Sequence, residues 1–284
     1  MTSARVDPIT PYQIFPPVGQ AGPLVFASPH SGAIRPDDLN PAPGLSLASL
    51  RSAEDALVDH LIATGPDHGA PVIAGRLSRV YVDLNRAPDE LDPVLIPDAM
   101  VAGVSSKTSA GFGVIPRRTG DGVALYDRTL DMAEATRRLK TAHAPYHAAL
   151  TRLMETARTV HGQAILVDWH SMPARATGGA GRTRGADVVL GDRHGSSCDA
   201  RLTQRLRTLF EGLGWRVSLN HPYAGGYTTQ TWGRPEDGFE AVQIELSRAL
   251  YLDETTLKPG KGFEYCRAAI ARVIAALAAD DWRR

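Results

Sequence analysis

The chain has 284 residues, 43% of them hydrophobic and 22% charged, a composition typical of a globular protein. Its 31 lysine and arginine residues balance 31 aspartate and glutamate residues, so no excess of positive charge indicates nucleic acid or a membrane surface as a partner. Two distant cysteines argue against a disulfide framework, and because there is no long apolar run we expect neither a signal peptide nor a membrane-spanning segment. We therefore expect a cytoplasmic single-domain protein over residues 1–284, either a monomer or a small homo-oligomer.

Apolar strands alternate with amphipathic helices along most of the chain. After a proline-rich start over 1–23, expected on the surface, the pattern predicts a strand at 24–28, a helix at 45–65, strands at 71–75 and 79–86, an irregular segment at 87–127, a helix at 129–160 interrupted at Pro145, a strand at 164–170, a glycine-rich loop at 177–185, a strand at 186–192, a helix at 197–214, a strand at 215–220, a loop at 221–238, a strand at 239–248 and a helix at 260–281. This order predicts an α/β fold with a largely parallel sheet covered on both faces.

Two of the predicted strands lead directly into a histidine. The stretch "LVFASPHSG" (24–32) presents His30, and "ILVDWHSMP" (165–173) presents His170. Ligands of largely parallel sheets gather at the carboxyl ends of the strands, so both histidines are expected to reach one crevice. One histidine after a strand is more often a satisfied polar residue than a metal ligand. The presence of two histidines at matching strand ends gives equal weight to a shared metal site and to a structural role.

A hydrolytic zinc site with two histidines commonly takes a carboxylate as its third protein ligand. The stretch "SAEDALVD" (52–59) offers Glu54, Asp55 and Asp59. Asp55 and Asp59 are four residues apart, which places them on one face of the expected helix, with Asp59 able to support Asp55. Asp168 is expected to orient a ligating histidine by accepting its second N–H group.

A second histidine pair competes for the metal. His143 and His147, in "HAPYH", have the i, i+4 spacing found in metalloproteases. Those enzymes carry a glutamate between the two histidines, and here alanine, proline and tyrosine fill the gap. We therefore interpret this pair as structural.

Glu245 lies inside the apolar strand "VQIELSR" (242–248). Burial of a carboxylate without a partner is costly, so a partner is implied. One interpretation is a water molecule on the metal, for which Glu245 would be the general base. The alternative is a salt bridge in the core with an arginine such as Arg248.

The stretch "SRVYVDLNR" (78–86) ends in polar groups that could bind substrate. Asn85 and Arg86 could hold the carboxylate of an acidic substrate, since arginine forms bidentate pairs with carboxylates. Arg79 could polarise a carbonyl group. The alternative is an ordinary exit from a strand with solvated arginines.

An ordered set of motifs resembles N-formylglutamate amidohydrolases from about residue 24 to about residue 250. The motifs are "SPHSG", "ED…VD", "SRVYVDLNR", "GFGVIPR", "PYH", "LVDWHSMP", "NHPYAGGYTTQ" and "IELSR". The resemblance implies a three-layer α/β/α fold with a central mixed, largely parallel sheet, as in the zinc carboxypeptidase and aspartoacylase relatives (a phosphorylase/hydrolase-like fold). The chain departs from the HxxE spacing of that superfamily, because Gly32 and Ala33 follow His30 and Ser31.

The resemblance also implies roles for individual residues. One zinc ion per chain would be bound by His30, Asp55 and His170, with Glu54 as the alternative to Asp55. Glu245 matches the catalytic glutamate of the superfamily. The asparagine and arginine of "DLNR", Asn85 and Arg86, match residues that bind the substrate carboxylate in aspartoacylase-like relatives.

The implied activity is the hydrolysis of N-formyl-L-glutamate to formate and L-glutamate, as in histidine degradation. Glu245 would deprotonate a zinc-activated water, and Arg79 would stabilise the oxyanion. The loops at 177–185 and 224–226 could close over this small acidic N-acyl amino acid. One alternative is a related N-acyl amino acid deacylase or carboxypeptidase-like amide hydrolase with another substrate. A second is a non-enzymatic binding protein on the same scaffold.

Overall fold

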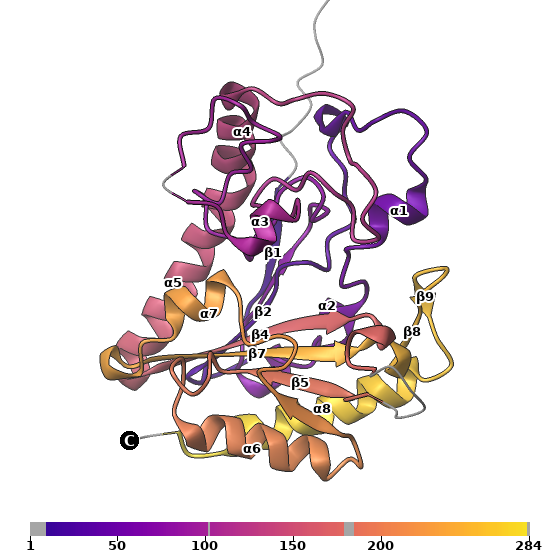
Figure 1. The fold of residues 1–284 in the computed structure, drawn as a ribbon. Coiled ribbons are helices and arrows are strands. Elements are labelled where there is room, and N and C mark those ends of the chain that lie inside the picture. Colours follow the sequence, from indigo (N-terminus) through magenta and orange to yellow (C-terminus); the bar gives the residue numbers. More distant parts are fainter. Residues whose placement is uncertain (1–9, 102, 179–184, 283–284) are drawn as a thin grey trace, which may run out of the picture.

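A seven-stranded sheet runs through the middle of the molecule in the order β1-β3-β2-β4-β7-β5-β6 (Figure 1). The computed structural model describes residues 10–101, 103–178 and 185–282. Strands β3, β2, β4 and β7 are parallel, β1 is antiparallel to β3, β5 is antiparallel to β7, and β6 is parallel to β5. The strands are β1 (Tyr12–Phe15), β2 (Leu24–Ser28), β3 (Val72–Gly75), β4 (Ala164–Met172), β5 (Val188–Gly191), β6 (Val217–Leu219) and β7 (Phe239–Ser247). The predicted mixed, largely parallel sheet is confirmed.

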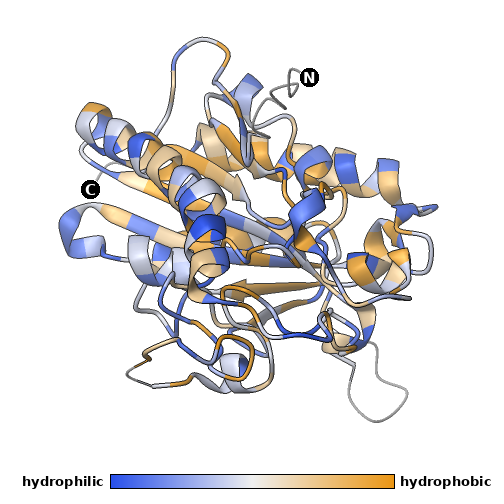
Figure 2. Ribbon diagram, turned by 90° about the horizontal axis from the view of Figure 1, so that it is seen from above, coloured by the Kyte–Doolittle hydropathy of each residue, from blue (hydrophilic) through white to orange (hydrophobic). Residues whose placement is uncertain are grey.

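Helices cover both faces of the sheet, which completes the predicted α/β/α layers. Figure 1 shows α4, α5 and α7 on one side and α6 and α8 on the other. Figure 2 shows apolar residues along the strands and mixed hydropathy along the helices, as amphipathic covering helices require. No helix in the described part of the chain is long and apolar enough to cross a membrane. The helices are α1 (Leu47–Arg51), α2 (Val58–Leu61), α3 (Ser106–Ser109), α4 (Met132–Arg138), α5 (Ala144–His161), α6 (Ala200–Glu211), α7 (Tyr227–Trp232) and α8 (Phe263–Ala279), and a hairpin joins β8 (Leu252–Asp253) to β9 (Lys258–Pro259).

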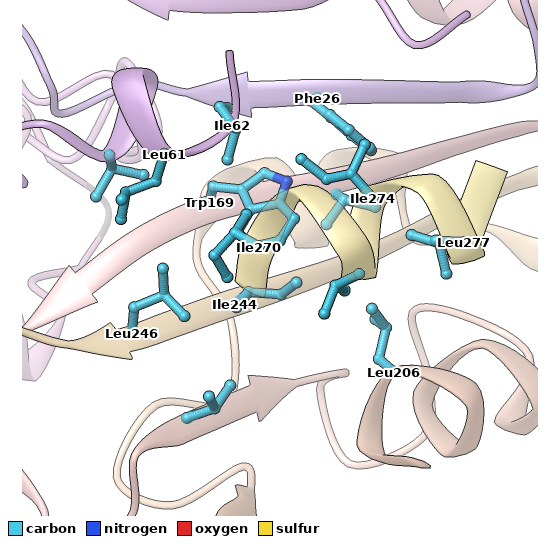
Figure 3. Close-up of a cluster of buried hydrophobic side chains, with 14 of the residues drawn as sticks. Phe26, Leu61, Ile62, Trp169, Leu206, Ile244, Leu246, Ile270, Ile274 and Leu277 are labelled. Carbon is cyan, nitrogen blue, oxygen red and sulfur yellow. The ribbon is translucent and has the colours of Figure 1, made fainter. Parts of the chain in front are cut away.

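The two central strands β4 and β7 are buried along their whole length. Alternate side chains of β4 point to opposite faces of the sheet. Trp169 points into the core under α8, where it packs edge-on against Phe26 at a ring distance of 5.9 Å (Figure 3). His170 therefore points to the other face, and the strand register sets it opposite Glu245. The alternation of side chains along β4 thus directs Trp169 into the hydrophobic core and His170 to the opposite face of the sheet.

The prediction of a single helix over residues 45–65 is wrong. An irregular turn separates α1 from α2, and within it Leu57 has a positive φ of 66°, which a continuous α-helix does not allow. The backbone N–H of Asp55 donates to the carbonyl of His30 at 3.0 Å. This bond anchors Asp55 to the end of β2, so the helical face expected to be shared with Asp59 does not exist.

The strand predicted at 79–86 is also wrong. The segment forms turns, although Val80, Val82 and Leu84 are buried in the core cluster that includes α5. The alternation of apolar residues therefore reflects side-chain burial without pairing of the backbone in a sheet.

Three further segments differ in detail. The edge strand β1 lies in the proline-rich start, and α7 lies inside the loop predicted at 221–238. The expected interruption of the helix at 129–160 takes the form of a π-helical stretch, Leu139–His143, which ends two residues before Pro145. Proline cannot donate an amide hydrogen bond and crowds the carbonyl four residues earlier, which disfavours regular α-helical spacing there.

Candidate metal centre

Three buried side chains from separate segments converge at the carboxyl ends of β2 and β4. The Nδ1 atoms of His30 and His170 are 3.1 Å apart. Asp55 Oδ2 is 3.0 Å from His170 Nδ1 and 3.4 Å from His30 Nδ1. Each of the three residues is at most 2% exposed. Within the described ranges, no other group of three or more histidine, cysteine or acidic side chains could hold a metal ion.

The separations fit one face of a tetrahedral zinc site. Two ligands at the usual zinc distances, about 2.0 to 2.1 Å, lie roughly 3.4 Å apart at a tetrahedral angle. Two histidine nitrogens and one carboxylate oxygen also form a ligand set that catalytic zinc commonly takes, with a fourth position left for water. The geometry and chemistry of the His30, Asp55 and His170 cluster therefore suit a metal ion, and the donor atoms alone do not identify it.

Both histidines are oriented by carboxylates on their outer nitrogens. His30 Nε2 lies 2.8 Å from Asp83 Oδ1, and His170 Nε2 lies 3.0 Å from Asp168 Oδ2. In neutral rings whose Nε2 atoms donate to these carboxylates, both Nδ1 atoms can offer a lone pair to a cation placed between them and Asp55. Such a cation would take the place of the protons that otherwise hydrogen-bond to Asp55. Asp168 was expected in this role, whereas Asp83 was missed, although its place in "YVDLNR" is a usable signal.

Replacement of Asp83 by asparagine should weaken zinc binding by about 10- to 100-fold, the usual effect of losing such an outer carboxylate. The Arg79 and His30 charges hold the pKa of Asp83 well below its usual range against the effect of burial, so the native group is ionised. Competition with a chromophoric chelator measures the affinity. Asp92→Asn is the matched control, because Asp92 is equally buried and pairs with Arg117 at 2.8 Å outside the cluster. Equal losses in both variants would assign the effect to general destabilisation.

The position of Asp55 is fixed by its second oxygen. Arg248 Nη2 lies 3.3 Å from Asp55 Oδ1 and donates to the carbonyl of Glu54 at 2.8 Å. The side chain of Glu54 turns away and accepts a hydrogen bond from Arg51 at 2.7 Å. Burial raises the pKa of Asp55, but hydrogen bonds from the two histidines outweigh it and lower that pKa well below its usual range. Asp55 therefore joins the cluster, whereas Glu54 and Asp59 do not.

Glu245 faces the same side of the sheet as His170, its neighbour across β4 and β7. Its Oε1 accepts a hydrogen bond from Gln243 Nε2 at 2.9 Å. Glu245 forms no ion pair with any described residue, because Arg248, the suggested salt-bridge partner, binds Asp55 instead. Burial raises the pKa of Glu245 to about 7. A buried carboxylate of this kind is available for proton transfer.

The side chain of Asn85 makes its hydrogen bonds within the protein. Its Nδ2 atom lies 3.3 Å from Asp168 Oδ2 and 3.1 Å from His170 Nε2, and its Oδ1 accepts from the backbone N–H of Thr228 at 2.9 Å. The neighbouring Gly226 has no room for a side chain, since a Cβ there would lie 2.5 Å from Asn85 Nδ2. The first residues of α7 thus hold Asn85 in place, and Asn85 in turn contacts Asp168 and His170.

Arg79 and Arg86 both approach the outer carboxylate of the His30 branch. Arg79 Nε donates to Asp83 Oδ2 at 2.8 Å, and Arg86 Nε lies 4.0 Å from the same oxygen. The two side chains remain 28% and 19% exposed, so they face both the cluster and solvent. Arg86 Nε is buried and has no hydrogen-bond partner within the described residues.

His143 and His147 lie outside the metal cluster. Their Nε2 atoms bind the carbonyls of Arg86 and Leu84 at 2.8 Å and 2.9 Å, and their rings are 4.3 Å apart. The pair therefore supports the backbone that carries Asn85, in keeping with the structural interpretation.

A cavity of about 560 Å³ lies beside Arg248, between α1 and the hairpin of β8 and β9. Figure 1 shows both elements at the end of the molecule to which β4 and β7 point. Of the two loops expected to close over substrate, 177–185 lies mostly outside the described residues. The other, 224–226, packs on the protein, since a Cβ at Gly191 would lie 2.7 Å from the carbonyl carbon of Ala224.

Comparisons with known proteins match this chain to one family. A family model described as N-formylglutamate amidohydrolase matches residues 22–252. The chain is 31% identical over 240 residues to N-formylglutamate deformylase of Pseudomonas putida, and 30% identical over 242 residues to that of Pseudomonas aeruginosa, covering 82% of this chain and 83% of the relative in each case. The crystal structure of N-formylglutamate amidohydrolase from Ralstonia eutropha JMP134 superposes with a TM-score of 0.89 at 34% identity, covering 95% of this chain and 98% of that one.

Proposed function

This chain belongs to the N-formylglutamate amidohydrolase family, and from that premise we propose that it is a zinc-dependent enzyme that hydrolyses N-formyl-L-glutamate to formate and L-glutamate. One observation carries the proposal. Two imidazole nitrogens and a carboxylate oxygen lie 3.0 to 3.4 Å apart, on the side of the sheet that also bears Glu245 without an ion-pair partner.

Each residue of the site has its own role in the proposed reaction. A zinc ion held by His30, Asp55 and His170 supplies a Lewis acid and a water molecule of lowered pKa. Glu245 takes a proton from the attacking water and gives it to the leaving nitrogen as the C–N bond breaks. Its raised pKa, about 7, suits both steps. Arg79 stabilises the negative charge that develops on the carbonyl oxygen.

Asn85 and Arg86 form the proposed site for a carboxylate of the substrate. The buried Nε of Arg86 has no hydrogen-bond partner within the described residues, which supports direct binding of an anion there. Asn85 would also hold this site against the metal ligands, since its side chain contacts Asp168 and Thr228.

A substrate panel tests the proposal. Purified protein is assayed on N-formyl-L-glutamate, N-acetyl-L-glutamate and a glutamyl dipeptide, before and after chelation and after zinc is restored. We expect release of formate from the first compound, loss of activity on chelation and recovery with zinc. Preference for the acetyl compound would assign a related deacylase activity. No hydrolysis of any compound by zinc-loaded protein would favour a binding protein on the same scaffold.

A further inference from the structure

Three cationic side chains gather beside the metal cluster, and one of them has no part in the scheme above. Arg79 and Arg86 meet at Asp83, the carboxylate that orients His30. Lys107, on the short helix α3, lies near enough for its charge to interact with both arginines and with Asp83. Figure 1 shows α3 on the same side of the sheet as α5.

Glu90 fixes α3 beside Arg86. Its Oε2 accepts a hydrogen bond from Ser105, the N-cap residue of α3, at 3.2 Å, and lies 3.5 Å from Arg86 Nη1. Its carbonyl accepts from the backbone N–H of Val114 at 2.9 Å, which ties down the far end of the same segment. The segment that carries Lys107 is therefore anchored on both sides, with the start of α3 beside Arg86.

The carboxylates of this group pair with the arginines and not with Lys107. Asp83 pairs with Arg79 at 2.8 Å, and Glu90 pairs with Arg86 at 3.5 Å. The exposed Lys107 side chain makes no hydrogen bond or ion pair with any described residue. Partial desolvation and the two guanidinium charges lower the pKa of Lys107, so the protein itself disfavours its charge. An anion bound between Lys107 and Arg86 would relieve this repulsion.

We propose that Lys107 is a specificity-determining residue that binds the second carboxylate of a dicarboxylic N-formyl amino acid while Arg86 binds the first. The inference rests on the proposed function, which assigns binding residues to only one of the two carboxylates of the substrate. A neutral substrate side chain leaves Lys107 unpaired, whereas a carboxylate side chain forms an ion pair with it. The enzyme therefore selects glutamate over its neutral isostere, glutamine.

The test compares N-formyl-L-glutamate with N-formyl-L-glutamine in the zinc-loaded wild type and in Lys107→Met. The wild type should prefer the glutamate compound by up to about fivefold in kcat/KM, as expected for one partly exposed ion pair. Lys107→Met should lose that preference through a higher KM for the glutamate compound, with kcat and the glutamine compound little changed. Lys107→Arg should retain the preference. The matched control is Lys261→Met, another exposed lysine, at the start of α8.

Calorimetric binding of the product L-glutamate, compared with L-glutamine, gives a readout that needs no catalysis. Lys107→Met should weaken glutamate binding and leave glutamine binding unchanged. An unchanged preference in Lys107→Met, or a wild type without preference in both assays, overturns the assignment of Lys107. If the wild type hydrolyses neither compound, the proposed function fails, and the binding comparison still decides the role of Lys107.

Discussion

Glu245→Gln is expected to reduce kcat for N-formyl-L-glutamate by about a thousandfold or more while zinc stays bound. The substitution keeps the shape of the side chain and its contact with Gln243, but an amide cannot accept a proton from water. Glu245 does not belong to the metal cluster, so zinc content should remain near one ion per chain. Single-turnover kinetics and mass spectrometry of the metal measure the two quantities.

The pH profile gives an independent measurement of the same group. The base must be ionised, and burial raises the pKa of Glu245 to about 7, so wild-type kcat/KM should fall as the pH is lowered through that region. A bound cation shifts the fall to lower pH, because its charge favours the carboxylate. Glu240→Gln, a control on the same strand, should keep both the activity and the profile. Substantial turnover by Glu245→Gln would remove this residue from the scheme.

His170→Gln is expected to abolish zinc binding and, with it, all measurable hydrolysis. The imidazole supplies one of three ligand atoms, and its loss also leaves Asp55 and Asp168 facing each other without the group between them. Hydrogen bonds and charges from these carboxylates raise the pKa of His170 above its usual value against the effect of burial. The substitution should therefore lower the melting temperature as well as the zinc content.

The matched control is His147→Gln, since His147 is partly buried and its side chain hydrogen-bonds, among the described residues, to the carbonyl of Leu84. A glutamine can keep that hydrogen bond, so zinc content should stay near that of the wild type. His30→Gln provides a second ligand variant if His170→Gln does not fold. Zinc retained at full occupancy in a folded ligand variant would exclude the proposed coordination.

The errors in secondary structure fall at the site. The segment 45–65 has the apolar spacing of one helix, but the bond from Asp55 to the carbonyl of His30 replaces helical geometry with a turn. The segment 79–86 alternates like a strand, but its polar residues bind histidines and arginines in turns. Long-range contacts override local propensity in both places, as is common where side chains are held for chemistry.

Local sequence determined the central strands, because a strand buried on both faces needs a continuous apolar run. It also marked His30, His170 and Glu245, since polar groups at the ends of such runs stand out from their surroundings. The resemblance favoured Asp55 over Glu54, but only the tertiary structure shows the reason, since Asp55 lies in the cluster and Glu54 turns toward Arg51. Tertiary structure alone showed the part played by Asp83. The reason is that a ligand cluster depends on distances between segments that are remote along the chain, and these distances are set by how the turns pack on the sheet.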